Sequence, residues 1–210
     1  MKIIVRDLSK VFNGRSVFRG VGLELSTGDS LAITGPNGSG KTTLMKILAG
    51  VLSPTSGKVE FWRDGKLFKA EEMRGSIGYV GPYVQMYDEF TALENLQFLN
   101  AIRDLRKDSK VFGDLLKRVG LYHRRDDLVR GFSSGMKQRL KYAVALSSNP
   151  EILFLDEPTS NLDDSGIEMV REVIRDQKNH GILLVATNDA AEAKWCRRIL
   201  KLSGEVPTPR

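Results

Sequence analysis

One short segment limits what this chain can fold into more than any other. It fits the pattern G-x-x-x-x-G-K-[S/T] in full and consists of Gly35, Pro36, Asn37, Gly38, Ser39, Gly40, Lys41 and Thr42. An apolar run at residues 31–34 precedes it, and a helical pattern follows over residues 42–49. Glycines at this spacing let backbone N–H groups turn inward, and amides at a helix N-terminus bind anions. The segment predicts a phosphate-binding loop between a buried strand and a helix.

The last two residues of this segment have distinct expected roles. Lys41 brings a positive charge to the β- and γ-phosphates of a nucleotide, and the Thr42 hydroxyl is offered to Mg²⁺. A chance glycine-rich turn is the alternative, but the flanking strand and helix argue against it. We therefore expect a nucleotide and Mg²⁺ as cofactors.

Two acids follow a second buried strand. Residues 152–155 are fully apolar, and Asp156 and Glu157 come directly after them. Ligands of open α/β sheets bind beyond the carboxyl ends of the strands. We assign Asp156 to the metal and Glu157 to the attacking water, which a carboxylate can position and polarise. Two solvated acids at a strand end are the alternative, which the phosphate loop in the same chain disfavours.

The hydrophobic pattern alternates between strands and helices along most of the chain, which favours a mostly parallel α/β sheet. We expect one domain over residues 1–210 with a mainly helical insertion at about residues 84–148. Expected strands cover residues 3–8, 23–25, 31–34, 58–62, 77–80, 152–155, 182–186 and 199–202. Expected helices cover residues 42–49, 91–105, 110–119, 133–148 and 165–178.

Composition restricts where such a chain works. No run approaches the roughly 18 apolar residues of a membrane-spanning helix, and the first apolar run is too short for a signal peptide. We expect a cytoplasmic protein that reaches a membrane only through a partner. The sole cysteine, Cys196, is interpreted as a packing residue. Residues 103–141 carry a net charge of +7, which we interpret as a solvated helical face rather than a site for phospholipid head groups or nucleic acid.

The motifs together resemble the ATP-binding subunits of ABC transporters, and the likeness covers nearly the whole chain. Residues 35–43, ending at Thr43, match the phosphate loop of that family, and residues 156–160 match its acidic strand end. Residues 132–136, which include Ser133 and Gly135, resemble its signature segment, and residues 160–163 resemble its dimer-contact loop. Phe12 stands where the family places an aromatic that stacks on adenine, although a core aromatic is an open alternative.

The resemblance implies a P-loop NTPase fold with an N-terminal antiparallel β portion. It also implies a head-to-tail dimer, with a second copy or a related subunit, in which each ATP contacts one phosphate loop and the partner's signature segment. Ser133 and Gly135 are the expected ligand contacts of that segment. A polytopic membrane subunit would hold the dimer at the inner face of the cell membrane. A weaker likeness, from residues 91–96, is to the small haem-exporter subunits of cytochrome c maturation.

The chain departs from the family pattern in three segments. Ser134 and Met136 replace a glycine and a glutamine of the signature segment. Pro82 or Tyr83 occupies the place of a glutamine that helps to hold metal and water, and Gln85 replaces it only if the loop is shifted.

The third departure is Asn188, which takes the place of a histidine that contacts the γ-phosphate. Its amide can donate a hydrogen bond but cannot carry a proton or positive charge as histidine does. We expect intact ATP and Mg²⁺ binding with slow hydrolysis, and we assign catalysis to Glu157, Lys41 and Asn188.

Two other functions stay open from the sequence. One is an ABC-type ATPase that acts on ribosomes or DNA, which salt-dependent nucleic-acid binding would reveal. The other is a nucleotide-sensing module with vestigial hydrolysis, which the departures favour and the intact Asp156 and Glu157 disfavour.

Overall fold

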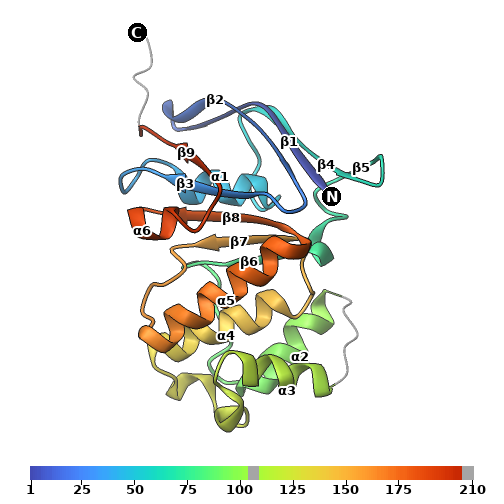
Figure 1. Ribbon diagram of the computed structural model, residues 1–210, viewed down its shortest axis with the longest axis vertical. Coiled ribbons are helices and arrows are strands. Elements are labelled where there is room, and N and C mark those ends of the chain that lie inside the picture. The colour runs from blue at the N-terminus through green and yellow to red at the C-terminus, as the bar shows by residue number, and fades with distance from the viewer. Residues whose placement is uncertain (104–108, 205–210) are drawn as a thin grey trace.

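The phosphate loop follows the fourth strand of a five-stranded parallel sheet in the order β6-β7-β8-β3-β9 (Figure 1). The computed structural model describes residues 1–103 and 109–204. The central strands are continuous apolar runs, as suits strands that are covered on both faces. The strands are β3 (Ser30–Thr34), β6 (Ile77–Val80), β7 (Ile152–Asp156), β8 (Ile182–Thr187) and β9 (Arg198–Lys201).

A second sheet is antiparallel and has the order β2-β1-β4-β5. Its outer hairpins are closed by two-residue loops in which both residues have positive φ: 48° and 77° at Asn13 and Gly14, and 50° and 75° at Asp64 and Gly65. Such loops match the twist of the strands that they join. The strands are β1 (Lys2–Phe12), β2 (Arg15–Ser26), β4 (Ser56–Arg63) and β5 (Lys66–Phe68).

Helix α1 (Lys41–Leu48) directly continues the phosphate loop and lies between the two sheets (Figure 1). Its buried face contributes Leu44 and Met45 to one hydrophobic core. That core also takes Ile3 and Leu8 from β1 and Phe154 from β7. The position of the loop is therefore fixed by packing on both sides of the helix that follows it.

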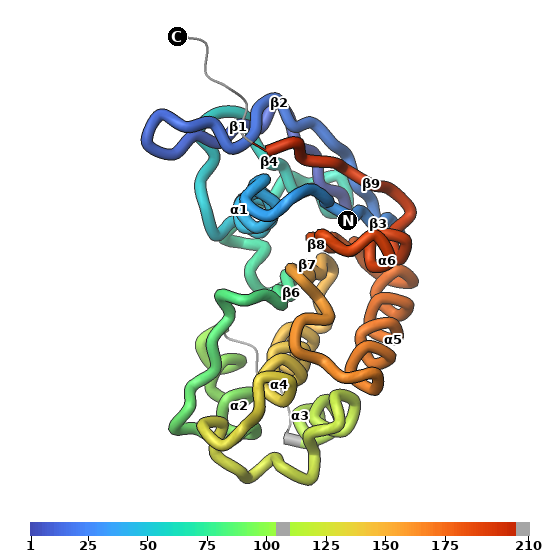
Figure 2. Tube along the Cα trace, turned by 90° about the vertical axis from the view of Figure 1, so that its left-hand side faces the viewer, coloured from blue at the N-terminus to red at the C-terminus, as the bar shows by residue number. Residues whose placement is uncertain are grey.

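The opposite face of the parallel sheet is covered by helices. Leu153 and Leu155 of β7 alternate with Phe154 and pack into a second core with these helices. Figure 2 shows α2 and α3 below the strands, with α4 and α5 reaching up to the parallel sheet. The helices are α2 (Ala92–Ile102), α3 (Ser109–Arg118), α4 (Ser134–Leu146), α5 (Asp164–His180) and α6 (Ala190–Ala193).

The expected fold class is confirmed, including the antiparallel portion at the N-terminus. The sequence pattern missed most of β2, all of β5 and the short helix α6. The helix expected at residues 91–105 has its described part in α2, and residues 104 and 105 lie outside the described residues. Within residues 1–103 and 109–204, no helix has the length and apolarity needed to cross a bilayer.

Candidate active site

The phosphate loop has a backbone that only glycine allows at two positions. Gly35 has φ 148°, and a Cβ atom there would lie 2.4 Å from the carbonyl oxygen of Leu202. Gly40 has φ 95°, and a Cβ atom would lie 2.4 Å from Cγ1 of Val17. The loop is therefore held between β2 and the segment after β9, with its amides at the N-terminus of α1.

Lys41 is curled across the loop that precedes it. Its ammonium donates to the carbonyl oxygen of Gly35 at 2.9 Å and to that of Pro36 at 3.2 Å. Only 6% of the residue is exposed, so the charge is held against the phosphate loop. The positive charge of Lys41 also acts to lower the pKa of Asp156 and of Glu157. The ammonium therefore interacts electrostatically with both carboxyl groups.

Asp156 ends β7 and is almost fully buried, with 1% of its surface exposed. Burial raises the pKa of its carboxyl group, while Thr42, Tyr79 and the charges of Lys41 and Lys46 act to lower it. Among the described residues, Oδ1 of Asp156 is buried without a hydrogen-bond partner. An unpartnered oxygen on a carboxylate that interacts with the Thr42 side chain suits a hard cation such as Mg²⁺.

Glu157 follows with an unusual backbone. Its φ of 52° lies in the left-handed region, and its N–H donates to the carbonyl oxygen of Ala186 at 2.9 Å. Such a conformation costs about 1 kcal/mol or more and persists where neighbours enforce it, often at functional sites. Burial raises the pKa of Glu157, and the charges of Glu192, Asp156 and Asp189 add to that shift.

One cavity of about 400 Å³ joins the phosphate loop, Glu157 and Phe12. Phe12 is 46% exposed at the end of β1, which is an exposure that suits a stacking platform better than a core residue. The cavity is lined by Phe12, Val17, Asn37, Gly38, Gly40, Lys41, Thr42, Thr43, Tyr83 and Glu157.

The loop after β6 brings Tyr83, and not Gln85, to this cavity. The Tyr83 ring is exposed, and Nζ of Lys46 lies 3.4 Å from its centroid. Gln85 lines a separate cavity of about 420 Å³ together with Ser134 and Asn161. Gln85 and Thr42 thus line different cavities, and a metal role for Gln85 is expected only if this loop is shifted.

Asn188 reaches the phosphate loop from the end of β8. Its side-chain amide donates to Oδ1 of Asn37 at 3.2 Å. Asn37 lines the cavity of the phosphate loop, so this bond brings two distant parts of the sequence together at its edge.

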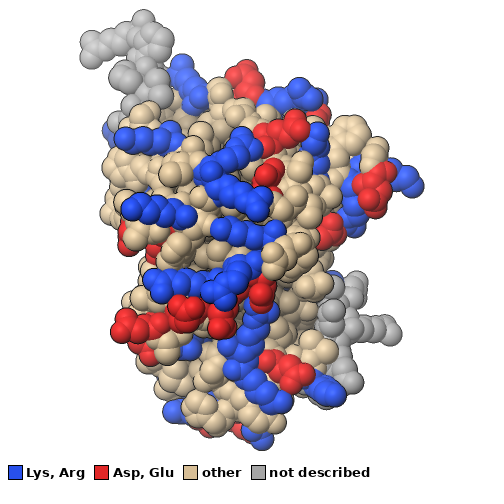
Figure 3. All heavy atoms as spheres, in the orientation of Figure 1, with Lys and Arg blue, Asp and Glu red and all other residues tan. Residues whose placement is uncertain are grey.

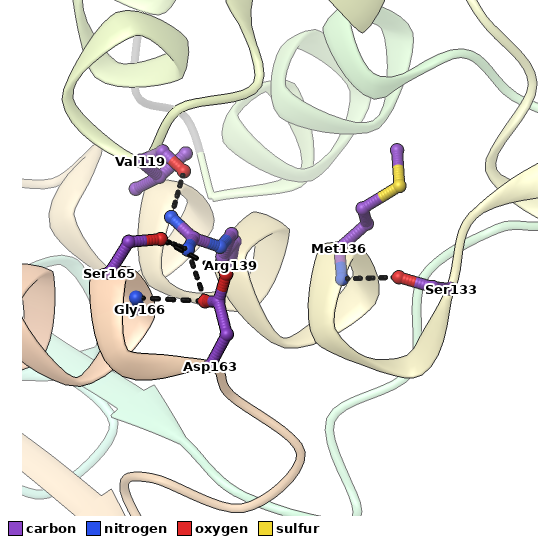
Figure 4. A network of polar contacts seen from close by, with 7 residues as sticks. All are labelled: Val119, Ser133, Met136, Arg139, Asp163, Ser165 and Gly166. Carbon is purple, nitrogen blue, oxygen red and sulfur yellow. Dashed lines mark hydrogen bonds and ion pairs between the residues drawn. The ribbon is translucent and has the colours of Figure 1, made fainter.

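Ser133 and Gly135 begin α4 and do not line the phosphate-loop cavity. Ser133 is the N-cap residue, and its Oγ accepts from the Met136 N–H at 3.2 Å (Figure 4). A Cβ atom on Gly135 would lie 2.7 Å from the carbonyl oxygen of Asn161, so only glycine allows this approach of the two loops.

An arginine fixes α4 against the start of α5. Nη2 of Arg139 donates to Asp163 and to Ser165 at 2.6 Å each, and Nη1 donates to the carbonyl oxygen of Val119 at 3.3 Å (Figure 4). Arg139 lowers the pKa of Asp163, which also accepts from the N–H of Gly166. The orientation of the Ser133 turn is thereby linked to α5.

Sequence reasoning missed two residues of the site. The hydroxyl of Tyr79 donates to Oδ2 of Asp156 at 3.2 Å, and burial raises the pKa of this tyrosine, so the proton stays in place. The buried carboxylate of Glu192 accepts from the hydroxyls of Thr159 and Thr187. Their positions depend on strand register and on the placement of α6, which no local motif indicates.

Comparisons with known proteins point to one family. The family model described as ABC transporter matches residues 18–160. An uncharacterized ABC transporter ATP-binding protein of Bacillus subtilis, YxlF, is 36% identical, with 96% of this chain and 68% of the relative aligned. The lantibiotic transport ATP-binding protein SrtF of Streptococcus pyogenes is 34% identical over 88% of this chain and 78% of its own.

A solved structure shows the same fold in an assembled form. The dimeric bacterial ABC transporter cassette MJ0796 superposes with a TM-score of 0.85 at 26% identity, over 96% of this chain and 94% of that one. The phosphate loop, the acidic strand end and these likenesses lead to one assignment. This chain belongs to the ABC transporter family, as an ATP-binding domain with ATPase activity.

Proposed function

We propose that this ATPase powers a membrane transporter by closing and reopening a head-to-tail dimer around two ATP molecules. The observation that carries the proposal is the split of the site. Phe12, the phosphate loop and Glu157 share one cavity, whereas Ser133 and Gly135 lie outside it. A second subunit that brings its own Ser133 turn to the γ-phosphate would complete each site.

Mg²⁺ fits the residues present. The unpartnered Oδ1 of Asp156 and the Thr42 hydroxyl would hold it together with phosphate oxygens and water. When bound, the ion would neutralise charge that develops on the phosphates. Gln85 would join this set only after a shift of its loop.

The chain's own groups have separable roles in hydrolysis. Lys41 would move from the carbonyl oxygens of Gly35 and Pro36 to the β- and γ-phosphates. Glu157 would orient the attacking water, and Asn188 would donate to the γ-phosphate. Because Asn188 is uncharged and Tyr83 lines the cavity in place of a glutamine, hydrolysis would be slow.

The partners follow from this cycle. A second copy or a related ATPase subunit would supply the other half of each site, and a polytopic membrane subunit would receive the movement at the inner face of the membrane. The dimeric cassette MJ0796 supports the first of these, and the transport named for SrtF supports the second.

The basic segment gives little support to a nucleic-acid function. Its described cations are mostly paired with acids, among them Arg118 with Asp176 and Lys137 with Asp88. Figure 3 shows acidic groups interspersed with basic ones in the lower half of the face in view. Such pairing favours a solvated surface over a phosphate-binding stripe.

A substitution at Glu157 tests the proposal. Glu157→Gln keeps the side-chain shape but removes the base, so ATP should hold the variant as a dimer in size-exclusion chromatography with light scattering. The unmodified chain with ADP should elute as a monomer in the same experiment. A Glu157→Gln chain that stays monomeric at saturating ATP contradicts the nucleotide-sandwich dimer.

A further inference from the structure

Strand register places Tyr79 directly beside the metal-site strand. Tyr79 of β6 pairs with Phe154 of β7, and Phe154 and Asp156 lie on the same face because they are two residues apart. The Tyr79 ring stacks on Phe154 with centroids 6.0 Å apart and 24° between the planes. From there its hydroxyl reaches Oδ2 of Asp156 at 3.2 Å.

The two oxygens of Asp156 thus differ in their surroundings. Oδ2 accepts the hydrogen bond from Tyr79, whereas Oδ1 is buried and has no hydrogen-bond partner within residues 1–103 and 109–204. Leaving a buried carboxylate oxygen unpartnered costs free energy, which a bound cation recovers. The hydrogen bond therefore selects which oxygen is offered to the metal.

The surrounding backbone leaves room for this contact. A Cβ atom on Gly81 would lie 2.7 Å from Cε1 of Tyr79 and 3.2 Å from Cβ of Asp156. Nζ of Lys141 on α4 donates to the carbonyl oxygen of Gly81 at 3.1 Å and fixes this turn. Tyr79 also lines a cavity of about 700 Å³.

We propose that Tyr79 is a positioning residue that holds Asp156 by Oδ2 and so directs Oδ1 toward the Mg²⁺ of the nucleotide. This inference rests on the proposed metal role of Asp156. It adds a residue that touches neither the metal nor the nucleotide and acts only through the carboxylate. Partners of this kind orient metal ligands, and their loss lowers metal affinity by about 10- to 100-fold.

The test is the change Tyr79→Phe, which keeps the ring on Phe154 and removes only the hydroxyl. Binding of Mn²⁺, as a spectroscopic substitute for Mg²⁺, would be titrated by electron paramagnetic resonance with a non-hydrolysable ATP analogue present. We expect Mn²⁺ affinity to fall about 10-fold. Binding of the analogue in the presence of EDTA should stay unchanged, because Tyr79 is not among the described residues that line the phosphate-loop cavity.

Two comparisons make the result specific. Tyr122→Phe removes a hydroxyl from the exposed turn after α3 and should leave both affinities unchanged. In an Asp156→Asn background, Tyr79→Phe should cause no further loss, because residues that act as one unit are not additive. An equal loss in both backgrounds overturns the inference, since Tyr79 would then act independently of Asp156.

The same measurements distinguish the role of Tyr79 from the metal role of Asp156. If Asp156→Asn weakens Mn²⁺ binding but Tyr79→Phe does not, only the role of Tyr79 is wrong. If Asp156→Asn leaves Mn²⁺ affinity unchanged, the metal role of Asp156 is wrong and the inference is overturned with it. Thermal unfolding of each variant verifies that the chain is folded in every titration.

Discussion

The side-chain amide of Asn188 donates a hydrogen bond of 3.2 Å to Oδ1 of Asn37, which lies 151 positions earlier in the chain. The bond crosses from the carboxyl end of β8 to the phosphate loop. It holds an uncharged donor at the edge of the phosphate-loop cavity, where the resemblance to ABC subunits predicts a histidine. The consequences of that exchange can be measured directly.

Asn188→His should raise the turnover number about 10-fold. An imidazolium donates a charge-assisted hydrogen bond, and a gain of about 1.4 kcal/mol in the transition state corresponds to a tenfold rate increase. Steady-state ATPase assays with purified chain give the turnover number, and calorimetry gives the nucleotide affinity, which should change little. Asn188→Ala is the control and should reduce turnover. An unchanged rate in Asn188→His removes Asn188 as the cause of slow hydrolysis.

Ser133→Ala should abolish ATP-driven dimerisation in the Glu157→Gln background. Loss of the N-cap at α4 costs stability of about 1 kcal/mol, so an effect on folding must be separated from an effect on the dimer. Thr91 provides the matched control, because it caps α2 through a hydrogen bond from the Glu94 N–H at 3.1 Å. Thr91→Ala should lose similar stability and still dimerise. Equal dimerisation in both variants would show that Ser133 does not contact the partner's nucleotide.

Much of the fold is predictable from local patterns. The buried strands β3, β7 and β8 are unbroken apolar runs, and the phosphate loop lies between β3 and α1 as its motif requires. Strand β2 was missed beyond three residues because its inner and outer residues do not alternate strictly, and β1 and β2 are paired through several register shifts. The Asn13-Gly14 and Asp64-Gly65 pairs were the available signals for both hairpins.

The site is less predictable, because strand register and the conformations of loops bring its residues together. The motif spacing indicated Lys41, Asp156 and Glu157, and the structure places all three close together. The contact of Tyr79 with Asp156 depends on the pairing of β6 with β7, which has no local sequence signal. The conformation of the loop after β6 brings Tyr83 rather than Gln85 to the phosphate-loop cavity.

Asp156→Asn should stabilise the metal-free chain at neutral pH. Burial raises the folded-state pKa of Asp156, so the native state favours the protonated form. The contribution of the protonated carboxyl to folding stability is fully present below the pKa of Asp156 in the unfolded chain. It is lost as the pH rises through the pKa of Asp156 in the folded chain. Asparagine stays neutral, so its advantage should grow as pH rises toward 7.

Thermal unfolding in EDTA at several pH values measures this difference. The midpoint should rise at pH 7, where each 1 kcal/mol of stabilisation corresponds to about 2–4 °C in a chain of this size. Asp126→Asn, at an exposed position, is the control and should change the midpoint little. If Asp156→Asn and the unmodified chain unfold at the same midpoint at pH 7, burial does not destabilise the ionised carboxylate.

The buried carboxylate of Glu192 joins the two strand ends that carry the proposed catalytic residues Glu157 and Asn188. It accepts from Thr159, two residues after Glu157, and from Thr187, the neighbour of Asn188. The N–H of Asp189 also donates to the Thr187 hydroxyl at 2.9 Å, which extends the network into the start of α6. Only 5% of Glu192 is exposed, so water cannot easily replace a lost partner.

Glu192→Gln should therefore reduce both stability and turnover while leaving nucleotide affinity unchanged. The amide nitrogen cannot accept, so one threonine hydroxyl loses its acceptor at a cost of about 1–3 kcal/mol. Small displacements of positioned groups slow catalysis strongly, and we expect a turnover number about 10-fold lower. Glu172→Gln on the exposed face of α5 is the matched control. If the midpoint of unfolding falls while the turnover number stays normal, Glu192 supports the fold without positioning Glu157 or Asn188.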